Sequence, residues 1–226
     1  AADRVPVIPG PGSNDARKTV GTPRAVSEID GVDAALVVAP YYNKPNQEGM
    51  YRHFKEVADR GGLPVVLYNV PSRTGVSMSA ETVSRLAEHD NVVAIKEASG
   101  DMRLTTRIAE EAGDDIQLMS GDDFTTYPLV AIGGTGCVSV ASNLIPGTMS
   151  DLVDATRRGE LERAQRLHQQ IQPLARMLFS EPNPVPTKVA ASILGWCAPD
   201  VRAPMYQPSE EFFDLMEDFI QDYELL

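Results

Sequence analysis

Residues 92–96 read Val-Val-Ala-Ile-Lys, and this stretch decides the fold. Four apolar residues in a row, without alternation of polar and apolar positions, are typical of a strand that is buried on both faces of a parallel sheet. The run ends in Lys96, and lysine is rarely buried without a purpose. We therefore expect an α/β protein with a lysine at the carboxyl end of a parallel strand.

Similar apolar runs occur on both sides of this stretch, and helical patterns separate them. The other predicted strands are residues 5–8, 34–38, 64–68, 116–120 and 136–140, and the helices between them are residues 48–60, 79–89, 101–112 and 124–132. The βαβαβα order with short connections predicts a parallel sheet with right-handed crossovers. Six βα units are visible, whereas a closed eight-stranded α/β barrel needs eight.

The predicted secondary structure changes after the sixth predicted strand. From about residue 148 onward it reads as helices only, at residues 151–158, 160–178 and 186–194, with a last helix that opens at Pro208-Ser209-Glu210. Pro173 is expected to kink the second of these helices. We therefore predict a domain of barrel type at residues 1–147 and a helical region at residues 148–226.

The composition of the chain limits which partners it can bind and in which cellular compartment we expect it. The 226 residues include 20 Lys and Arg against 32 Asp and Glu, a net charge of −12, which argues against nucleic acid and anionic membranes. No run of about 18 apolar residues exists to cross a membrane, and the first residues show no secretory signal. Cys137 and Cys197 are too few for a disulfide framework, and we expect two buried thiols in a reducing cytoplasm.

Lys96 is the most informative residue for function. Burial disfavours the charged ammonium, so part of the lysine can be a neutral amine near pH 7. A neutral amine at a strand end can attack a ketone and form a Schiff base. The alternative is a structural lysine that is paired with Glu97 or with another neighbouring carboxylate, and the single residue favours this alternative.

Other strand ends carry residues that suit a substrate site, because active sites of parallel α/β proteins gather there. Tyr68 can relay protons or can simply pack with its hydroxyl tied to a neighbour. Arg73 lies five residues later and can hold a carboxylate in a bidentate fork or cap carbonyls at the surface. The pair Tyr41-Tyr42 is consistent with an interface between chains.

Several other chemistries are disfavoured. The three histidines, His53, His89 and His168, lie in separate helical patterns without metal-ligand spacing, so we expect no metal. The glycine-rich residues 133–136 lack the lysine of a phosphate loop and fit a helix stop. Asp122-Asp123 is interpreted as the cap of the helix that follows, not as a cation site.

The strand ends together resemble the dihydrodipicolinate synthase family of pyruvate-dependent class I lyases. The resemblance rests on residues 68–75 (Tyr-Asn-Val-Pro-Ser-Arg-Thr-Gly), 95–98 (Ile-Lys-Glu-Ala), 39–45 (Ala-Pro-Tyr-Tyr-Asn-Lys-Pro), 120–123 (Ser-Gly-Asp-Asp) and 181–184 (Glu-Pro-Asn-Pro). It runs from about residue 5 to the C-terminus. The implied fold is a TIM (β/α)8-type barrel, of which this chain holds about six βα units, followed by a C-terminal helical extension.

The resemblance implies a lyase that condenses pyruvate with aspartate semialdehyde in lysine and diaminopimelate biosynthesis, in the cytoplasm. By resemblance Lys96 forms the Schiff base, Tyr68 transfers protons beside it, and Tyr42 reaches across a dimer interface. Arg73 would bind the carboxylate of the second substrate. Gly121 and Val138 would line the pyruvate pocket through backbone contacts. No dissociable cofactor is implied, and members are typically homotetramers built from dimers.

Departures from the family keep two alternatives open. The family begins with two further βα units, and the Gly-Thr-Thr-Gly-Glu motif that ends the second does not occur in this sequence. One alternative is therefore a truncated, non-catalytic paralogue that acts as an assembly partner. The other is a 2-keto-3-deoxy sugar acid or N-acetylneuraminate aldolase, although Arg73 favours the synthase.

Regulation is a further expectation from the resemblance. The feedback site for lysine in some family members would involve Asn14 and Tyr41. Lys18 stands near a position where an acidic residue is usual, so we do not expect inhibition by lysine. Where the family has a continuous helix, Gly21 and Pro23 interrupt the pattern here, and Pro23 is expected to break that helix.

Overall fold

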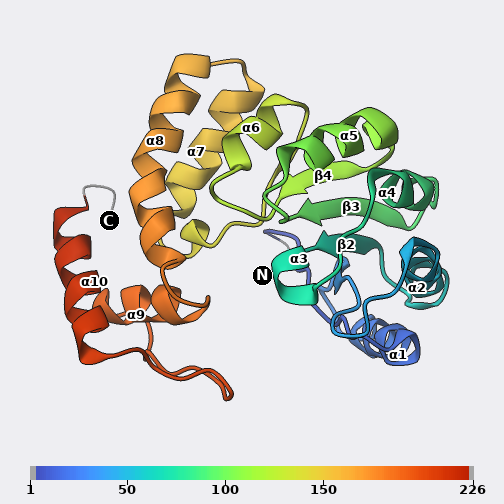
Figure 1. Cartoon of the computed structure of the whole chain (residues 1–226), viewed down its shortest axis with the longest axis horizontal. Helices are drawn as coiled ribbons and strands as arrows, with labels where there is room; N and C mark the ends of the chain where they lie inside the picture. Colours follow the sequence, from blue (N-terminus) through green and yellow to red (C-terminus); the bar gives the residue numbers. More distant parts are fainter. Residues whose placement is uncertain (1–3, 224–226) are drawn as a thin grey trace. The chain divides into compact units, whose positions relative to one another are not determined.

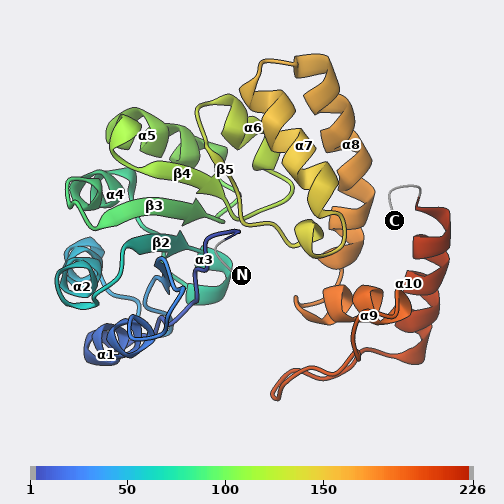
Figure 2. The same ribbon diagram turned by 180° about the vertical axis from the view of Figure 1, so that it is seen from behind.

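The computed structural model describes residues 4–223, shown in Figures 1 and 2. The chain divides into two compact units, residues 1–137 and residues 138–226. The first unit holds all the strands, and the second holds only helices. The boundary between a barrel domain at residues 1–147 and a helical region at residues 148–226 stays a prediction.

The first unit is built on one parallel sheet whose strands follow the order β1-β2-β3-β4-β5, so each strand pairs with its neighbour in sequence. The strands are β1 (Ala35–Val38), β2 (Val65–Asn69), β3 (Val92–Glu97), β4 (Gln117–Ser120) and β5 (Gly136–Cys137). Their apolar residues form the core: Val65 and Leu67 of β2 and Ile95 of β3 are fully buried. The parallel sheet predicted from continuous apolar runs is confirmed.

The two outermost predicted strands differ from expectation. Residues 5–8 form no strand, although the Val7 carbonyl accepts from the Asp33 amide at 3.0 Å and the Pro9 carbonyl from the Leu36 amide at 2.8 Å. Pro6 and Pro9 have no N–H group to donate, so this extended segment cannot complete a ladder. At the other edge, β5 ends at Cys137 and the predicted continuation to Val140 is wrong.

Helices connect successive strands and pack along the sheet, with α2 against β2, α4 against β3 and α6 against β4 (Figure 1). They are α1 (Ala16–Val26), α2 (Gln47–Arg60), α3 (Pro71–Thr74), α4 (Ala80–Ala87), α5 (Met102–Ala112) and α6 (Thr126–Ala131), with a 3₁₀ turn η1 (Gly113–Asp115). Ser79 caps α4 as predicted, because its hydroxyl accepts from the Thr82 amide at 3.2 Å. The helix predicted to begin at Phe124 begins two residues later.

Pro23 does not break its helix, contrary to the prediction. It lies inside α1 and is buried, and its carbonyl accepts a hydrogen bond from the Ser27 amide at 2.7 Å. The helix starts at Asp15, whose side chain accepts from the amides of Arg17 and Lys18. The N-terminal cap and the packing of α1 on α2 outweigh the one helical hydrogen bond that proline cannot donate.

The second unit consists of helices, as the sequence predicts for this part of the chain. They are a 3₁₀ turn η2 (Ala141–Asn143), α7 (Pro146–Arg157), α8 (Leu161–Leu178), α9 (Val185–Ile193) and α10 (Glu210–Asp222). Pro173 lies inside α8, which runs without interruption to Leu178. Ser209 caps α10 through its hydroxyl, which accepts from the Phe212 amide at 3.3 Å.

Two expectations about surface and burial can be compared with the structure. Both cysteines are free thiols, but only Cys137 is half-buried, whereas Cys197 is exposed, so the prediction of two buried thiols is wrong for Cys197. Cys197 follows the end of α9, outside any helix or strand. No helix within residues 4–223 has the length and apolar character that a bilayer crossing requires.

Candidate active site

The centre of the candidate site is a pair of residues on neighbouring strands. Tyr68 of β2 stands opposite Lys96 of β3 in the sheet register. Both side chains are half-buried, and the Lys96 Nζ atom lies 4.2 Å from the centroid of the Tyr68 ring. The structure therefore brings together the two residues that the sequence ranks first for chemistry.

The surroundings of Lys96 make its amine easier to deprotonate than an amine in water, because they lower its pKa. Burial, which disfavours the charged form, is the main cause that lowers the pKa of Lys96. The Asp123 carboxylate raises this pKa and the Arg73 guanidinium lowers it. The face of the Tyr68 ring also attracts an ammonium, so this contact works against neutralisation. No ion pair between Lys96 and a carboxylate is present among residues 4–223.

Glu97 is not the partner of Lys96, so Lys96 is not a structural lysine that pairs with Glu97. Glu97 is only 2% exposed, and its Oε2 atom accepts from Asn69 Nδ2 at 2.8 Å. Its Oε1 atom accepts from the Ser99 amide at 2.6 Å. Adjacent residues of a strand point to opposite faces, so the Glu97 carboxylate lies away from the Lys96 amine.

The phenol of Tyr68 is held in its protonated form. Burial raises the pKa of Tyr68, and the nearby Arg73 guanidinium only partly offsets this effect. A phenol with a raised pKa keeps its proton at neutral pH and gives it up only to a group that becomes strongly basic during a reaction. Tyr68 is therefore placed to give a proton to a group that reacts at Lys96.

Gly121 leaves the space that the Lys96 side chain occupies. It follows β4, and its amide donates to the Glu97 carbonyl at 2.8 Å. A Cβ atom at position 121 would lie 2.7 Å from Lys96 Cε and 2.7 Å from Ala98 Cβ. Only glycine leaves room for the lysine chain here, so the structure places Gly121 against the amine-bearing residue.

Arg73 lies on the short helix α3, directly after β2. It is exposed, and its charge acts on both Tyr68 and Lys96. The helix ends at Gly75, whose φ of 75° belongs to the left-handed region that favours glycine. A guanidinium that lies near the Lys96 amine and the Tyr68 phenol suits the recognition of a substrate carboxylate.

Tyr41 and Tyr42 lie in the loop after β1. The Tyr42 ring is 87% exposed, and its amide donates to the Thr74 carbonyl of α3 at 3.3 Å, so this loop touches the helix that carries Arg73. Tyr42 has a φ of 73°, which is unusual for a residue other than glycine. Such strain is maintained only where the surrounding structure imposes it, and it clusters at functional sites.

The two regulatory candidates also lie together. Asn14 Nδ2 donates to the Tyr41 carbonyl at 3.2 Å, and the Asn14 carbonyl accepts from Asn43 Nδ2 at 3.0 Å. Asn14 lines a pocket of about 250 Å³ beside α2, with His53 and Arg52 in its wall. Val138, the remaining predicted pocket residue, belongs to the second unit and is 37% exposed.

The acidic pair after β4 has two different environments. Asp122 Oδ1 accepts from the Phe124 amide at 2.9 Å, but this bond closes the turn before α6, whose N-cap is Thr125, so the prediction that Asp122 caps the helix is wrong. Asp123 is 1% exposed and faces the site, since its charge acts on both Lys96 and Cys137. Burial is the main cause that raises the pKa of the Cys137 thiol to about 11, so this thiol is unreactive at neutral pH.

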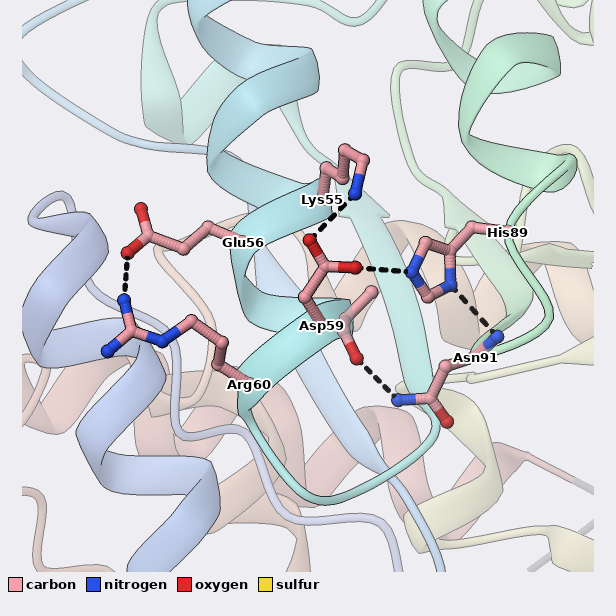
Figure 3. Close-up of polar contacts among 7 residues, drawn as sticks. Lys55, Glu56, Asp59, Arg60, His89 and Asn91 are labelled. Atoms are coloured by element: carbon pink, nitrogen blue, oxygen red, sulfur yellow. Dashed lines mark hydrogen bonds and ion pairs between the residues drawn. The ribbon is translucent and has the colours of Figure 1, made fainter.

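A second polar cluster, shown in Figure 3, lies before β3, at the end of the strand opposite Lys96. His89 Nε2 lies 2.9 Å from Asp59 Oδ1, and His89 Nδ1 accepts from the Asn91 amide at 3.1 Å. Both ring nitrogens are therefore occupied, and no basic nitrogen remains to act on a substrate. His89 lies just after α4, outside the helix to which the sequence pattern assigns it.

The described part of the chain holds no group of three or more His, Cys, Asp or Glu side chains that could bind a metal ion. The sequence reasoning missed the partnership of Asn69 and Glu97 and the spatial role of Gly121. The sequence does hold one indication of the Asn69–Glu97 pair: each of these residues directly follows a proposed catalytic residue at the end of a strand. Hydrogen bonds across strands become visible only with the register.

Comparison with known proteins now assigns the family. The model of the dihydrodipicolinate synthetase family matches residues 1–222. The chain belongs to this family. It is similar to the 4-hydroxy-tetrahydrodipicolinate synthase of Pelobacter propionicus, with 48% identity over 202 residues, which cover 89% of this chain and 69% of the relative. The synthase of Geobacter sp. strain M21 is 46% identical over 99% of this chain and 77% of its own length.

Solved structures of family members agree with the fold. Dihydrodipicolinate synthase from Aquifex aeolicus matches with a TM-score of 0.95 and 39% identity, over 100% of this chain and 77% of that chain. The synthase from Acinetobacter baumannii, solved in complex with pyruvate, matches with a TM-score of 0.96 and 37% identity over the same shares. The family fold of an α/β barrel, of which this chain holds part, is confirmed together with the helices that follow it.

Proposed function

We propose that this chain binds pyruvate covalently through Lys96 and condenses it with aspartate semialdehyde. The observation that carries the proposal is the desolvated amine of Lys96, free of any ion pair among residues 4–223, against the face of Tyr68. The names of the family relatives support the same reaction. No dissociable cofactor takes part, because the lysine itself supplies the carbonyl chemistry.

The proposed reaction begins with attack of the Lys96 amine on the pyruvate ketone. Tyr68 gives a proton to the hydroxyl of the resulting carbinolamine, water leaves, and an imine forms. The imine acidifies the pyruvate methyl group, and the Tyr68 phenolate takes a methyl proton to leave an enamine. The enamine carbon then bonds to the aldehyde carbon of the second substrate, and the aldehyde oxygen takes the proton from Tyr68. The amino group of that substrate then attacks the imine carbon and releases Lys96, so the condensation loses one water in total.

Arg73 and Gly121 have supporting roles in this proposal. Arg73 holds the carboxylate of aspartate semialdehyde at the rim of the site, and Gly121 leaves space for the Lys96 chain. The chain acts in the cytoplasm and assembles into a homo-oligomer, a dimer or a tetramer, in which Tyr42 contributes to the site of a second copy.

Borohydride reduction in the presence of pyruvate tests the covalent step. We expect one stable adduct per chain, mapped to Lys96 by peptide mass spectrometry, and none in Lys96→Arg. The condensation is tested separately, by turnover of pyruvate with aspartate semialdehyde against cleavage of 2-keto-3-deoxy sugar acids and N-acetylneuraminate. Preferred turnover of a sugar acid would replace the synthase by an aldolase.

The oligomer is tested by sedimentation velocity at micromolar concentration. We expect a dimer or larger assembly and a shift toward monomer in Tyr42→Ala, since the 87% exposed ring would lose its contact with the second copy. Tyr206→Ala is a matched control, because this ring is equally exposed in the second unit. An unchanged distribution in Tyr42→Ala would remove Tyr42 from the interface.

A further inference from the structure

Directly behind the candidate catalytic pair lies a second, fully buried pair. The register that pairs Tyr68 with Lys96 pairs the next residues, Asn69 with Glu97. Side chains alternate along strands, so Asn69 and Glu97 share the opposite face of the sheet. Asn69 is 0% exposed and Glu97 is 2% exposed, and the two are joined by the 2.8 Å hydrogen bond from Nδ2 to Oε2.

This buried pair holds both segments that follow the two strands. On the β2 side, Asn69 Oδ1 accepts from the Met78 amide at 3.0 Å, and Asn69 Nδ2 also donates to Ser77 Oγ at 3.3 Å. Asn69 thus ties together the two ends of the loop that carries Arg73. On the β3 side, Glu97 Oε1 accepts from the Ser99 amide at 2.6 Å, which closes the turn directly after Lys96.

The backbones of the same two residues extend the connection to β4. The Asn69 carbonyl accepts from the Ala98 amide at 2.9 Å, and the Glu97 carbonyl accepts from the Gly121 amide at 2.8 Å. Gly121 and Ala98 are the residues that pack around the Lys96 chain. A shift of Asn69 or Glu97 is therefore transmitted to the walls around the amine.

We propose that Asn69 and Glu97 form a positioning pair that holds the Lys96 amine in its desolvated place and fixes the Arg73 loop beside it. The proposal rests on the proposed function, because it takes Lys96 and Arg73 as the groups that need positioning. Neither Asn69 nor Glu97 touches the reacting atoms. Each acts through hydrogen bonds on the segments that carry those atoms.

The donors and acceptors of this pair are fully determined, which makes a sharp test available. In Glu97→Gln, one amide oxygen must accept from Ser99, so the Gln nitrogen faces Asn69 Nδ2 and two donors oppose each other. In Asn69→Asp, two buried carboxylates oppose each other. The double variant reverses the polarity of the bond: the Gln nitrogen donates to the Asp carboxylate, whose other oxygen still accepts from the Met78 amide. It should restore what each single variant loses.

The first readout is the pKa of Lys96, taken from the pH dependence of its labelling by acetic anhydride, with the peptide quantified by mass spectrometry. The charged groups that act on this amine are Asp123 and Arg73, and neither is changed. We expect each single variant to raise the pKa of Lys96 by about one unit, because water reaches the displaced amine. The double variant should return most of the way to the wild-type value.

Asn91→Asp is the matched control for a purely structural effect. Asn91 precedes β3 at its other end, and its Nδ2 atom donates to the carbonyls of Ala58 and Leu63, both at 2.9 Å. This variant should lower thermal stability without moving the pKa of Lys96. A wild-type pKa of Lys96 in both single variants, or a double variant that recovers nothing, would overturn the positioning role.

The second readout is the rate of pyruvate capture at Lys96 per folded chain, which should fall about tenfold or more in the single variants and recover in the double variant. Failure of the proposed function has a different signature. A wild-type chain that captures no pyruvate, while the pKa of Lys96 still responds to the three variants as described, overturns the Schiff-base proposal and supports the positioning pair.

Discussion

At the scale of single residues, the site depends on which neighbour each charged group meets. The residue types at positions 68, 73 and 96 were sufficient to predict their proximity, because the ends of parallel strands meet at one edge of the sheet. The sequence alone could not separate a reactive Lys96 from one that is paired with Glu97. The register decides this point, since it turns Glu97 toward Asn69.

Gly121→Ala tests the space around the amine. The new Cβ atom would lie 2.7 Å from Lys96 Cε, so either the lysine or the turn after β4 must move. We expect a loss of about 1–3 kcal/mol in the free energy of unfolding and slower pyruvate capture per folded chain. Denaturant unfolding and timed borohydride trapping measure the two effects.

Gly147→Ala is the matched control, because nothing lies within 4 Å of a Cβ atom at that helical position. Its stability should be unchanged or higher by up to about 1 kcal/mol. Equal capture rates in Gly121→Ala and the wild type would show that Lys96 does not need this space.

His53 predicts a pH dependence of stability. It is buried on α2, its Nε2 atom has no hydrogen-bond partner among the described residues, and burial lowers its pKa to about 4. Between about pH 6.5 and pH 4 the unfolded chain binds a proton at this histidine and the folded chain does not. Stability should therefore fall as the pH decreases through this window, by at most about 3 kcal/mol.

His53→Leu removes this titration, so the difference in stability between the variant and the wild type should change across that window and level off below about pH 4. Urea unfolding at a series of pH values measures it. A difference that stays constant from pH 7 to pH 4 would place a charged histidine in the folded chain.

At the scale of elements, continuous apolar runs predicted the central strands well and the edges poorly. The runs at residues 64–68 and 92–96 are central strands, where burial on both faces produces the pattern. The run at residues 5–8 has the same apolar character but lies at the edge, where its prolines prevent a ladder. At Pro23 the local sequence instead predicts too little structure: proline disfavours a helix, yet α1 continues through Pro23 because the helix packs against its neighbour.

Helix α5 offers a test of capping beside the site. Asp101 Oδ1 accepts from the amides of Arg103 at 2.9 Å and Leu104 at 3.2 Å. Asp101→Ala should lower the free energy of unfolding by about 1 kcal/mol, because two backbone donors lose their acceptor. Asp101→Asn keeps an acceptor and should lose much less. Equal losses in the two variants would contradict capping as the role of Asp101, and thermal unfolding of both variants decides it.

At the scale of the whole molecule, the family assignment and the chemistry are separate conclusions. The assignment stands on identities of 46–48% to two synthases and on solved structures that match the whole chain. The chemistry depends on one amine that is uncharged often enough to attack a ketone. Motif spacing could predict which lysine this is. Its burial, however, depends on β2, β3 and β4, on Gly121 and on the pair of Asn69 and Glu97, which only the folded chain brings together.

The pH dependence of pyruvate capture at Lys96 tests this claim most directly. The chain is incubated with pyruvate and borohydride from pH 6 to pH 11, and the adduct at Lys96 is quantified against a surface lysine of the same chain, Lys55, which is paired with Asp59. Because burial lowers the pKa of Lys96, its initial rate of capture should reach half of its maximum below the ordinary lysine pKa of about 10.4. A rate that rises in parallel at Lys96 and Lys55 would show that burial does not lower the pKa of the Lys96 amine.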